Sequence, residues 1–260
     1  MKPYEYHTLF ANEDHHWYYV GLRYEILQAL RRFMRPASPG FRDIKVLDAG
    51  CGTGGLLAHL SQMNGRGPWS AGVEIAWEGL TLSRSRGLQN LLQGSVNALP
   101  LKPEQFDAII SIDVLYHIGV DEAQALREFV RVLKPGGIMI LQVPAFEWLR
   151  SEHDAAVSTK RRYSCAEVKR LVVDAGLTVR RSGYRNAMIF PVVAILRRWK
   201  HHRAQAEDAV SDLKSIPSML NTILLIVSII ESVFPWRILR SFIGVEVFCV
   251  ATKPLGGSPS

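Results

Sequence analysis

The chain has 260 residues, of which 48% are hydrophobic and 21% are charged, a composition typical of a globular protein with one sizeable core. Its three cysteines show no paired spacing, which argues against a disulfide framework and for a reducing compartment. The first twenty residues contain no apolar run of the kind found in signal peptides. We therefore expect one cytoplasmic domain spanning 1–260.

The net charge of +7 is unevenly distributed. Residues 160–203 contain 12 Lys and Arg but only two acids, Glu167 and Asp174. Such a segment is either a solvated basic face or a surface for an anionic membrane, an anionic substrate or nucleic acid.

Residues 1–40 are predicted to form a helical lid, because apolar side chains recur there at helical spacing. These are Tyr19, Leu22, Ile26, Leu30 and Phe33. Two prolines, Pro36 and Pro39, end the pattern.

The next segment, Lys-Val-Leu-Asp-Ala-Gly-Cys-Gly-Thr-Gly-Gly at 45–55, predicts a buried strand, a glycine-rich turn and a helix start. Glycine lets the backbone approach a ligand, and the first turn of a helix attracts an anionic group. Gly50, Gly52 and Gly55 also match the dinucleotide fingerprint, so a nicotinamide cofactor is a competing interpretation. Asp48 argues against it, because its carboxylate would repel a pyrophosphate but suits a ligand with an ammonium and a sulfonium group.

Strand and helix signals then alternate, which predicts an α/β fold with a mainly parallel sheet and helices on both faces. The expected strands are 44–48, 70–74, 90–93, 107–112, 138–143, 177–184 and 245–252. The expected helices are 54–64, 77–86, 121–133 and 164–175. The last of these begins with a capping box formed by Ser164 and Glu167 and ends at Gly176.

Four segments, in this order, resemble the class I methyltransferases that use S-adenosylmethionine (SAM). They are the glycine run, Gly72–Val73–Glu74, the strand at 106–113 and the turn at 133–137. The resemblance implies a Rossmann-like sheet of seven strands with an antiparallel strand seven, SAM as cofactor, and methyl transfer. Two further blocks, His16–Trp17–Tyr18–Tyr19 and His153–Asp154 with Arg161–Arg162–Tyr163, resemble a bacterial small-molecule subgroup.

The resemblance also implies a set of cofactor-binding residues. These are Asp48, Gly50, Cys51, Gly52, Glu74, Ser95, Val96, Ser111, Ile112, Tyr19 and Arg23. Asp48 and the turn would hold the methionine end, and Glu74 would accept hydrogen bonds from the ribose. Relatives often have an acid for the adenine amino group where this chain has Ser95 and Val96, so that contact is in doubt.

His153 is the predicted general base, because a histidine suits proton removal from a hydroxyl near neutral pH. The alternative is a loop residue that hydrogen-bonds the lid. Arg161 and Arg162 either hold an anionic substrate group or pair with neighbouring acids. No metal site is expected, since His15 and His16 have no further ligand at a suitable spacing.

Residues 185–244 are longer than a connection between strands six and seven requires, and they predict a helical insertion at the active-site edge. Within it, 219–231 is almost entirely apolar, with Asn221, Ser228 and Ser232 on one narrow stripe. Three roles are open for this helix. It is buried under the lid or in a dimer interface, it covers a hydrophobic substrate, or it contacts a membrane surface next to the basic residues at 197–200.

We therefore predict SAM-dependent methyl transfer to a lipophilic small molecule, with O-methylation favoured over C- or N-methylation. The Asn/Asp-Pro-Pro-aromatic sequence of base amino-methyltransferases is absent after the fourth strand, so no nucleic-acid partner is expected. Peripheral membrane contact or a homodimer through 186–235 is included among the expected partners. The alternatives are a SAM-binding or membrane-associated module without methyl transfer, a SAM-assisted rearrangement enzyme and, less favoured, a nicotinamide-dependent oxidoreductase.

Overall fold

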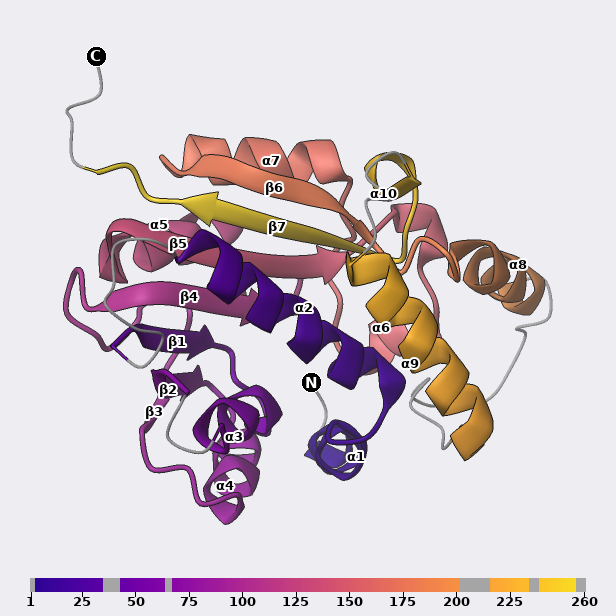
Figure 1. Ribbon diagram of the computed structural model, residues 1–260, viewed down its shortest axis with the longest axis horizontal. Coiled ribbons are helices and arrows are strands. Elements are labelled where there is room, and N and C mark those ends of the chain that lie inside the picture. The colour runs from indigo at the N-terminus through magenta and orange to yellow at the C-terminus, as the bar shows by residue number, and fades with distance from the viewer. Residues whose placement is uncertain (1–2, 35–42, 64–66, 202–215, 234–238, 256–260) are drawn as a thin grey trace.

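The computed structural model describes residues 3–34, 43–63, 67–201, 216–233 and 239–255. A seven-stranded sheet has the order β3-β2-β1-β4-β5-β7-β6 (Figure 1). Its strands are β1 Lys45–Ala49, β2 Trp69–Glu74, β3 Leu91–Gln93, β4 Phe106–Ile112, β5 Leu133–Pro144, β6 Thr178–Arg185 and β7 Glu246–Thr252. β7 pairs antiparallel with β5 and β6, and the pairs among β1 to β5 are parallel. The predicted fold class is confirmed.

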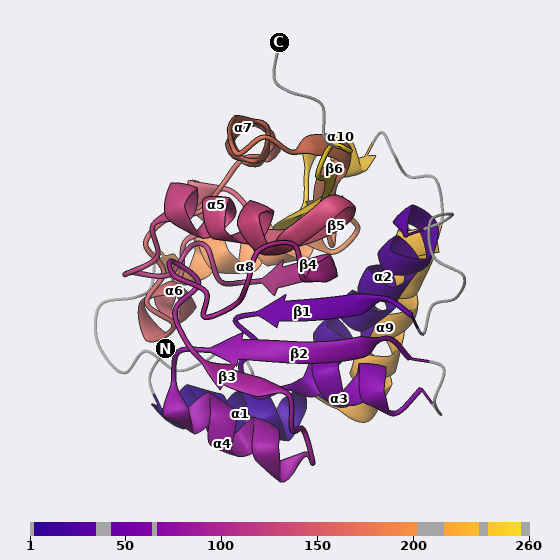
Figure 2. The ribbon, with the colours of Figure 1, turned by 90° about the vertical axis from the view of Figure 1, so that its left-hand side faces the viewer.

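Helices cover both faces of the sheet (Figure 2). They are α1 Pro3–Asn12, α2 Trp17–Phe33, α3 Gly55–Ser61, α4 Trp77–Ser85, α5 Glu122–Val132, α6 Glu152–Ala156, α7 Cys165–Asp174, α8 Phe190–His201, α9 Ser218–Val233 and α10 Leu239–Phe242, with a 3₁₀ turn η1 at Glu147–Leu149. One apolar core lies between the sheet and α5 and α7, and a second lies between the sheet and α2 and α3. Both cores form because side chains alternate between the two faces along each buried strand.

The N-terminal segment forms two helices, α1 and α2, rather than one continuous helical stretch (Figure 1). α2 begins after His16, whose Nδ1 accepts a hydrogen bond from the backbone N–H of Tyr18 at 3.3 Å. Such capping replaces a partner that the first helical turn lacks. Residue 40, the predicted end of the lid, lies outside the described residues. The division of residues 1–260 into a domain, a lid and an insertion stays a prediction.

β5 is longer than predicted. It begins at Leu133, which pairs with Phe106, whereas Ile138 pairs with Ala108, so the intervening residues form a bulge. Gly136 within it has a φ of 77°, a left-handed conformation that glycine adopts without a steric penalty. α7 agrees with prediction: both hydrogen bonds of the capping box between Ser164 and Glu167 are present.

The carboxyl ends of β1, β2, β4, β5 and β6 lie at one edge of the sheet, as parallel strands require. α6, α8, α9 and the first turns of α2 gather at this edge (Figure 1). Open α/β sheets bind their ligands at such an edge. No helix in the described parts of the chain is both long and apolar enough to cross a membrane.

Candidate functional site

The glycine-rich turn follows β1 and lies across the carboxyl ends of β1 and β2. Gly50, Gly52 and Gly54 have φ values of 91°, 54° and 79°, which L-residues with a side chain rarely adopt. The backbone N–H groups of Gly50 and Cys51 both donate to the carbonyl of Val73, at 2.8 and 3.1 Å. These bonds hold the turn against the neighbouring strand, so that its backbone faces the edge of the sheet.

Asp48 lies directly below this turn and is only 4% exposed. Within the described part of the chain, its carboxylate has no hydrogen-bond or ion-pair partner. Burial, together with the negative charges of Glu13 and Glu74, raises the pKa of Asp48 to about 8. A buried acid without a partner, between two further acids, is complementary to a cationic ligand group. The site therefore fits SAM, which carries an ammonium and a sulfonium group, better than it fits a pyrophosphate.

Glu74, the last residue of β2, joins the turn to α1. Its Oε2 accepts a hydrogen bond from the N–H of Gly52 at 3.0 Å, and its Oε1 accepts from the hydroxyl of Tyr6 at 3.1 Å and the N–H of Ala76 at 2.9 Å. The acid is thus at the predicted place beside the turn. Its contact with the ribose stays a prediction.

Glu13 lies against the first turn of α3, where we expected an anionic group of the ligand. A Cβ added to Gly55 would lie 2.3 Å from Oε2 of Glu13. The hydroxyl of Thr53 donates to Glu13, and Nη2 of Arg86 donates to it at 2.8 Å. The chain itself therefore supplies the carboxylate at this position.

Arg23, expected to bind the methionine carboxylate, holds the connection between α1 and α2. Its guanidinium donates to the backbone carbonyls of Glu13 and Asp14, the latter at 3.0 Å. Tyr19 lies near the start of α2, and its ring packs edge-on against Tyr18 with 5.1 Å between the ring centroids. Burial, followed by the charges of Asp113 and Glu13, raises the pKa of Tyr19. Both cofactor contacts stay predictions.

The remaining predicted cofactor residues have different surroundings. Ser95 Oγ accepts a hydrogen bond from the N–H of Asn97 at 3.2 Å, and Val96 is buried in the core beside α5 and α7. Ser111 is fully buried, and its hydroxyl has no hydrogen-bond partner among the described residues. Ile112 packs against the core under α2. Their roles toward the cofactor stay predictions.

Asp113 ends the strand that the sequence predicts at 106–113, beside Ser111 and Ile112, but it was not predicted to be catalytic. It follows β4 with a φ of 57°, a strained conformation for a residue with a side chain. Its carboxylate accepts hydrogen bonds from the hydroxyl of Tyr18 and from Nε2 of Gln142, both at 3.1 Å. The close packing around it raises its pKa to about 6, although these hydrogen bonds and the charge of Arg185 act in the opposite direction. An acid directly after the fourth strand was the available signal.

The predicted base, His153, belongs by its backbone to α6, but its side chain lies outside the described residues. The basic residues after it form internal pairs. Arg162 donates to both oxygens of Asp154 at 2.9 and 3.0 Å, and Arg161 donates to both oxygens of Glu122 at 2.9 and 2.6 Å. Of the two roles considered for these arginines, the structure shows the internal one. Among the described residues, no three His, Cys, Asp or Glu side chains are grouped as metal ligands.

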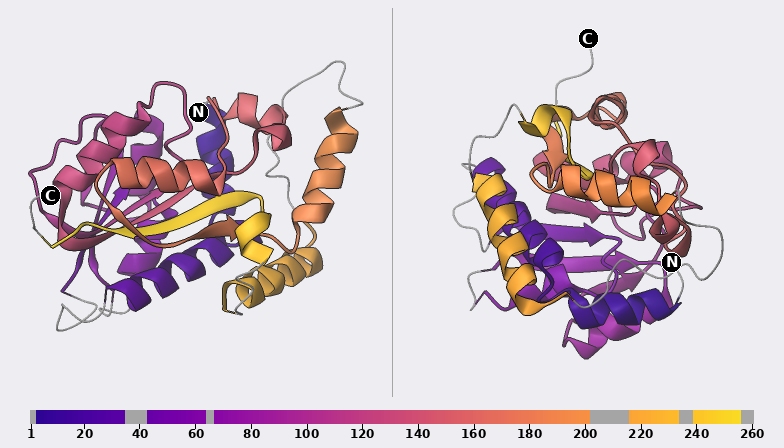
Figure 3. Two further views of the ribbon diagram at one scale, coloured as in Figure 1. Left: turned by 90° about the horizontal axis from the view of Figure 1, so that it is seen from above. Right: turned by 90° about the vertical axis from the view of Figure 1, so that its right-hand side faces the viewer.

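The insertion forms α8, α9 and α10, with residues 202–215 and 234–238 outside the described residues. Figure 3 shows α9 alongside α2. Three polar residues of α9 face inward: Ser228 and Glu231 are buried and Asn221 is half-buried, whereas Ser218 and Thr222 are exposed. Its exposed side chains are largely apolar, namely Met219, Leu220, Ile223, Ile226, Ile230 and Val233.

Comparison with known proteins finds similarity in the central part of the chain. Residues 47–141 match a family model described as a methyltransferase domain. A probable tRNA methyltransferase 9B of Mus musculus is 33% identical over 132 residues, which are 50% of this chain and 28% of that protein. A tRNA (carboxymethyluridine(34)-5-O)-methyltransferase of Arabidopsis thaliana is 34% identical over 119 residues, 44% of this chain and 26% of that protein. The chain thus spans about a quarter of the length of these relatives.

A solved structure extends the likeness to nearly the whole fold. It is a SAM-dependent methyltransferase of Thermotoga maritima, described as a possible histamine N-methyltransferase, with a TM-score of 0.57 and 20% identity. The match covers 96% of this chain and 95% of that one. At this identity the likeness concerns the fold.

The relatives correct our expectation about partners. We expected a lipophilic small molecule, no nucleic acid, and membrane or homodimer contact through 186–235. This expectation is wrong, because the similar proteins above are named as tRNA methyltransferases. The physical reason is that a missing Asn/Asp-Pro-Pro-aromatic sequence argues only against transfer to an exocyclic amine of a base. It does not bear on other acceptor atoms of a nucleic acid.

Proposed function

We infer that this chain, which carries a class I SAM-dependent methyltransferase domain, is an enzyme that transfers the methyl group of SAM to an oxygen atom of its acceptor. Bound SAM supplies an activated methyl group on a sulfonium. The protein then has to hold the acceptor in line and remove its proton. The observation that carries the proposal of oxygen transfer is Asp113, a carboxylate at the carboxyl end of β4.

Asp113 has the geometry and the acidity of a general base for a hydroxyl group. Its hydrogen bonds from Tyr18 and Gln142 fix the carboxylate, and it remains partly accessible. With a pKa raised to about 6, it is ionised at neutral pH yet more basic than an ordinary aspartate. We assign proton removal to Asp113 rather than to His153.

The cofactor end of the site follows from the acids around the glycine turn. Asp48 would pair with the ammonium group of SAM, and Glu74 would accept hydrogen bonds from the ribose. Both acids are buried beside the turn, at 4% and 6% exposure, and together they favour a cation.

For the acceptor, we propose tRNA. The names of the relatives support this choice, and one of them specifies transfer to an oxygen. The net charge of +7 also suits a polyanion, and Lys160, Lys169 and Arg170 are exposed cations near the active-site edge or on α7. The proposed tRNA acceptor takes the place of the small-molecule subgroup that the sequence analysis favoured, and the cytoplasmic location remains a prediction from sequence.

The test is methyl transfer from radiolabelled SAM to unfractionated tRNA and, separately, to a panel of lipophilic alcohols and phenols. The proposal is supported if the wild-type protein labels tRNA, if Asp113→Asn does not, and if the label is recovered in an O-methylated nucleoside. Label in the alcohols alone would overturn the tRNA acceptor. Binding of SAM without transfer to any acceptor would overturn methyl transfer itself.

A further inference from the structure

The inward polar stripe of α9 reaches the first turn of α2. Oδ1 of Asn221 accepts a hydrogen bond from the backbone N–H of Trp17 at 2.8 Å, and its Nδ2 donates to the carbonyl of His15 at 2.9 Å. The first N–H groups of a helix have no partner within the helix. A side chain from a distant segment therefore caps α2 and fixes where it begins.

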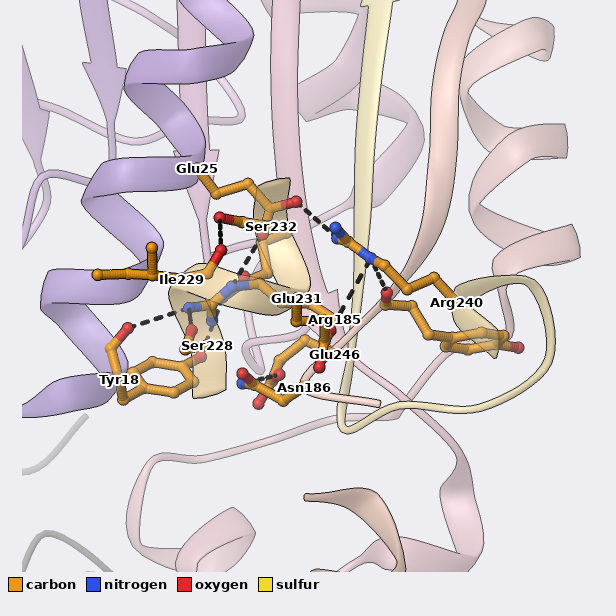
Figure 4. Close-up of polar contacts among 12 residues, drawn as sticks. Tyr18, Glu25, Arg185, Asn186, Ser228, Ile229, Glu231, Ser232, Arg240 and Glu246 are labelled. Carbon is orange, nitrogen blue, oxygen red and sulfur yellow. Dashed lines mark hydrogen bonds and ion pairs between the residues drawn. The ribbon is translucent and has the colours of Figure 1, made fainter. Parts of the chain in front are cut away.

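One turn further along, α2 and α9 approach each other closely. A Cβ added to Gly21 of α2 would lie 2.4 Å from the hydroxyl of Ser228 of α9, so only glycine permits this spacing. Nη2 of Arg185 donates to the carbonyl of Tyr18 at 3.2 Å and to the hydroxyl of Ser228 at 3.4 Å (Figure 4). Arg185 thus joins α9 to the same part of α2.

The guanidinium of Arg185 is itself held in place. Its carbon Cζ lies 5.1 Å from the centroid of the Tyr18 ring, and its Nε lies 3.2 Å from Oε2 of Glu25. Arg185 is only 2% exposed. Glu25 also pairs with Arg181 at 2.9 Å and Arg240 at 2.6 Å, so the cluster joins α2, β6 and α10 (Figure 4). Among the described residues, Nε and Nη1 of Arg185 have no hydrogen-bond partner, so the guanidinium is held by the ion pair with Glu25 and by the two hydrogen bonds of Nη2.

We propose that α9 is a clamp that holds Tyr18 against Asp113, with Asn221, Ser228 and Arg185 as its positioning residues. The inference rests on the proposed function of Asp113 as general base. It explains why α9 turns Asn221 and Ser228 inward: they supply partners that α2 and Arg185 need, and apolar side chains are left on the outside.

The groups that face Asp113 come from several elements. Tyr18 and Gln142 donate hydrogen bonds to it, and Arg185 and Arg162 favour its ionised form. Glu246 of β7 and Tyr19 and Tyr116 are also within electrostatic range of it. Among these, Tyr18 is the group whose position α9 controls. Loosening the clamp removes a hydrogen bond to the carboxylate and so raises its pKa.

The experiment compares the double variant Asn221→Ala, Ser228→Ala with a matched pair from the same helix, Thr222→Ala, Ser232→Ala. Among the described residues, the hydroxyls of Thr222 and Ser232 donate hydrogen bonds to carbonyls of α9 itself, those of Ser218 and Ile229. In the clamp variant, we expect kcat to fall roughly tenfold, with the Kd of SAM changed less than about twofold. In the pH profile of kcat, the rate falls on the acid side, and the midpoint of this fall (the acid limb) should move to higher pH by about 0.5 to 1. The control pair should behave as wild type.

A ¹³C NMR titration of the Asp113 carboxyl group, assigned with Asp113→Asn, separates this inference from the proposed function because it needs no turnover. A raised titration midpoint in the clamp variant supports the clamp, even if no acceptor is methylated. An unchanged midpoint and an unchanged acid limb in a folded clamp variant would overturn it. Equal shifts in the clamp and control pairs would overturn it as well, because they would reflect general loosening of α9.

Discussion

The hydroxyl of Tyr18 lies 3.1 Å from the carboxylate of Asp113, although the two residues are 95 positions apart in the chain. Nε2 of Gln142 donates to both of them, at 2.9 Å to Tyr18 and 3.1 Å to Asp113. The three side chains come from α2, the end of β4 and β5. α2 is thereby attached directly to the carboxylate that we assign as the base.

Because the base must be ionised, methyl transfer should depend on pH. The pKa of Asp113 is raised to about 6, so the rate should fall as the pH decreases through that value. Asp113→Asn should lower kcat about 100- to 10,000-fold and remove the acid limb. The measurement is the pH profile of kcat/KM for wild type and variant.

The control for this prediction is Asp107→Asn on the same strand, where Asp107 pairs with Lys134 at 2.8 Å, at the amino end of β4. It should keep kcat and the acid limb. An acid limb near pH 6 that persists in Asp113→Asn would assign the titrating base to another group.

Binding of SAM should strengthen as the pH rises toward 8. Without a ligand, Asp48 has a pKa of about 8 and is largely protonated at pH 6, whereas a cationic ligand requires its ionised form. The Kd of SAM should therefore fall roughly tenfold or more between pH 6 and pH 8, and binding at pH 7 should release protons. Calorimetry in buffers of different ionisation enthalpy measures both effects.

Asp48→Asn should bind SAM weakly and with no such pH dependence. A Kd that is constant from pH 6 to pH 8 in wild type would contradict the pairing of Asp48 with a cation.

The sequence predicted the sheet because its signals are local. A strand such as β7 contains a continuous apolar run between the polar residues Glu246 and Thr252, and α7 begins at a capping box that two residues specify. Asp48 and Glu74 could be placed at the edge of the sheet for the same reason, since Asp48 is the last residue but one of β1 and Glu74 is the last of β2. The turn at Gly50 follows from residues that favour a left-handed backbone.

The parts that were missed depend on contacts between distant segments. Glu13 carries no local sign that it would lie against α3 at Gly55. The apolar pattern of α9 favours a buried apolar side, but its polar stripe is inside, because Trp17 and Arg185 need acceptors there. Asp113 becomes a candidate base only once Tyr18 is placed beside it. Periodicity cannot show such pairings.

The charged cluster at Glu25 should contribute strongly to stability. Burial alone would raise the pKa of Glu25, but Arg240, Arg185 and Arg181 hold it below the ordinary value. Glu25→Gln removes the buried charge that pairs with these three guanidinium groups, so we expect a loss of about 3–5 kcal/mol in the free energy of unfolding. Urea denaturation at pH 7 measures this loss.

A carboxyl group whose pKa is lower in the folded than in the unfolded state stabilises the protein at pH values above its unfolded-state pKa. This contribution is lost as the pH falls through the folded-state pKa. The difference between wild type and Glu25→Gln should therefore shrink in acid, below about pH 4. The matched control is Glu104→Gln, because the exposed side chain of Glu104 pairs with Lys253 at 3.3 Å. This substitution should lower the free energy of unfolding by less than about 1 kcal/mol. Equal losses in the free energy of unfolding for both variants would contradict the prediction that the buried cluster stabilises the protein more than an exposed ion pair does.

Gly50→Ala should disturb the glycine-rich turn for a steric reason that can be tested separately from its backbone conformation. Gly50 has a φ of 91°, and a Cβ there would lie 2.3 Å from Cγ2 of Val114. Gly87 has a φ of 83° but nothing within 4 Å of its Cβ position. Gly87→Ala should cost about 1–2 kcal/mol for the left-handed conformation alone, and Gly50→Ala about 1–3 kcal/mol more for the clash.

The double variant Gly50→Ala, Val114→Ala should recover part of the added loss, because it removes the clashing methyl groups. Urea denaturation and SAM titration of the three variants measure this, and equal stability of Gly50→Ala and Gly87→Ala would contradict the close approach of Val114 to the turn.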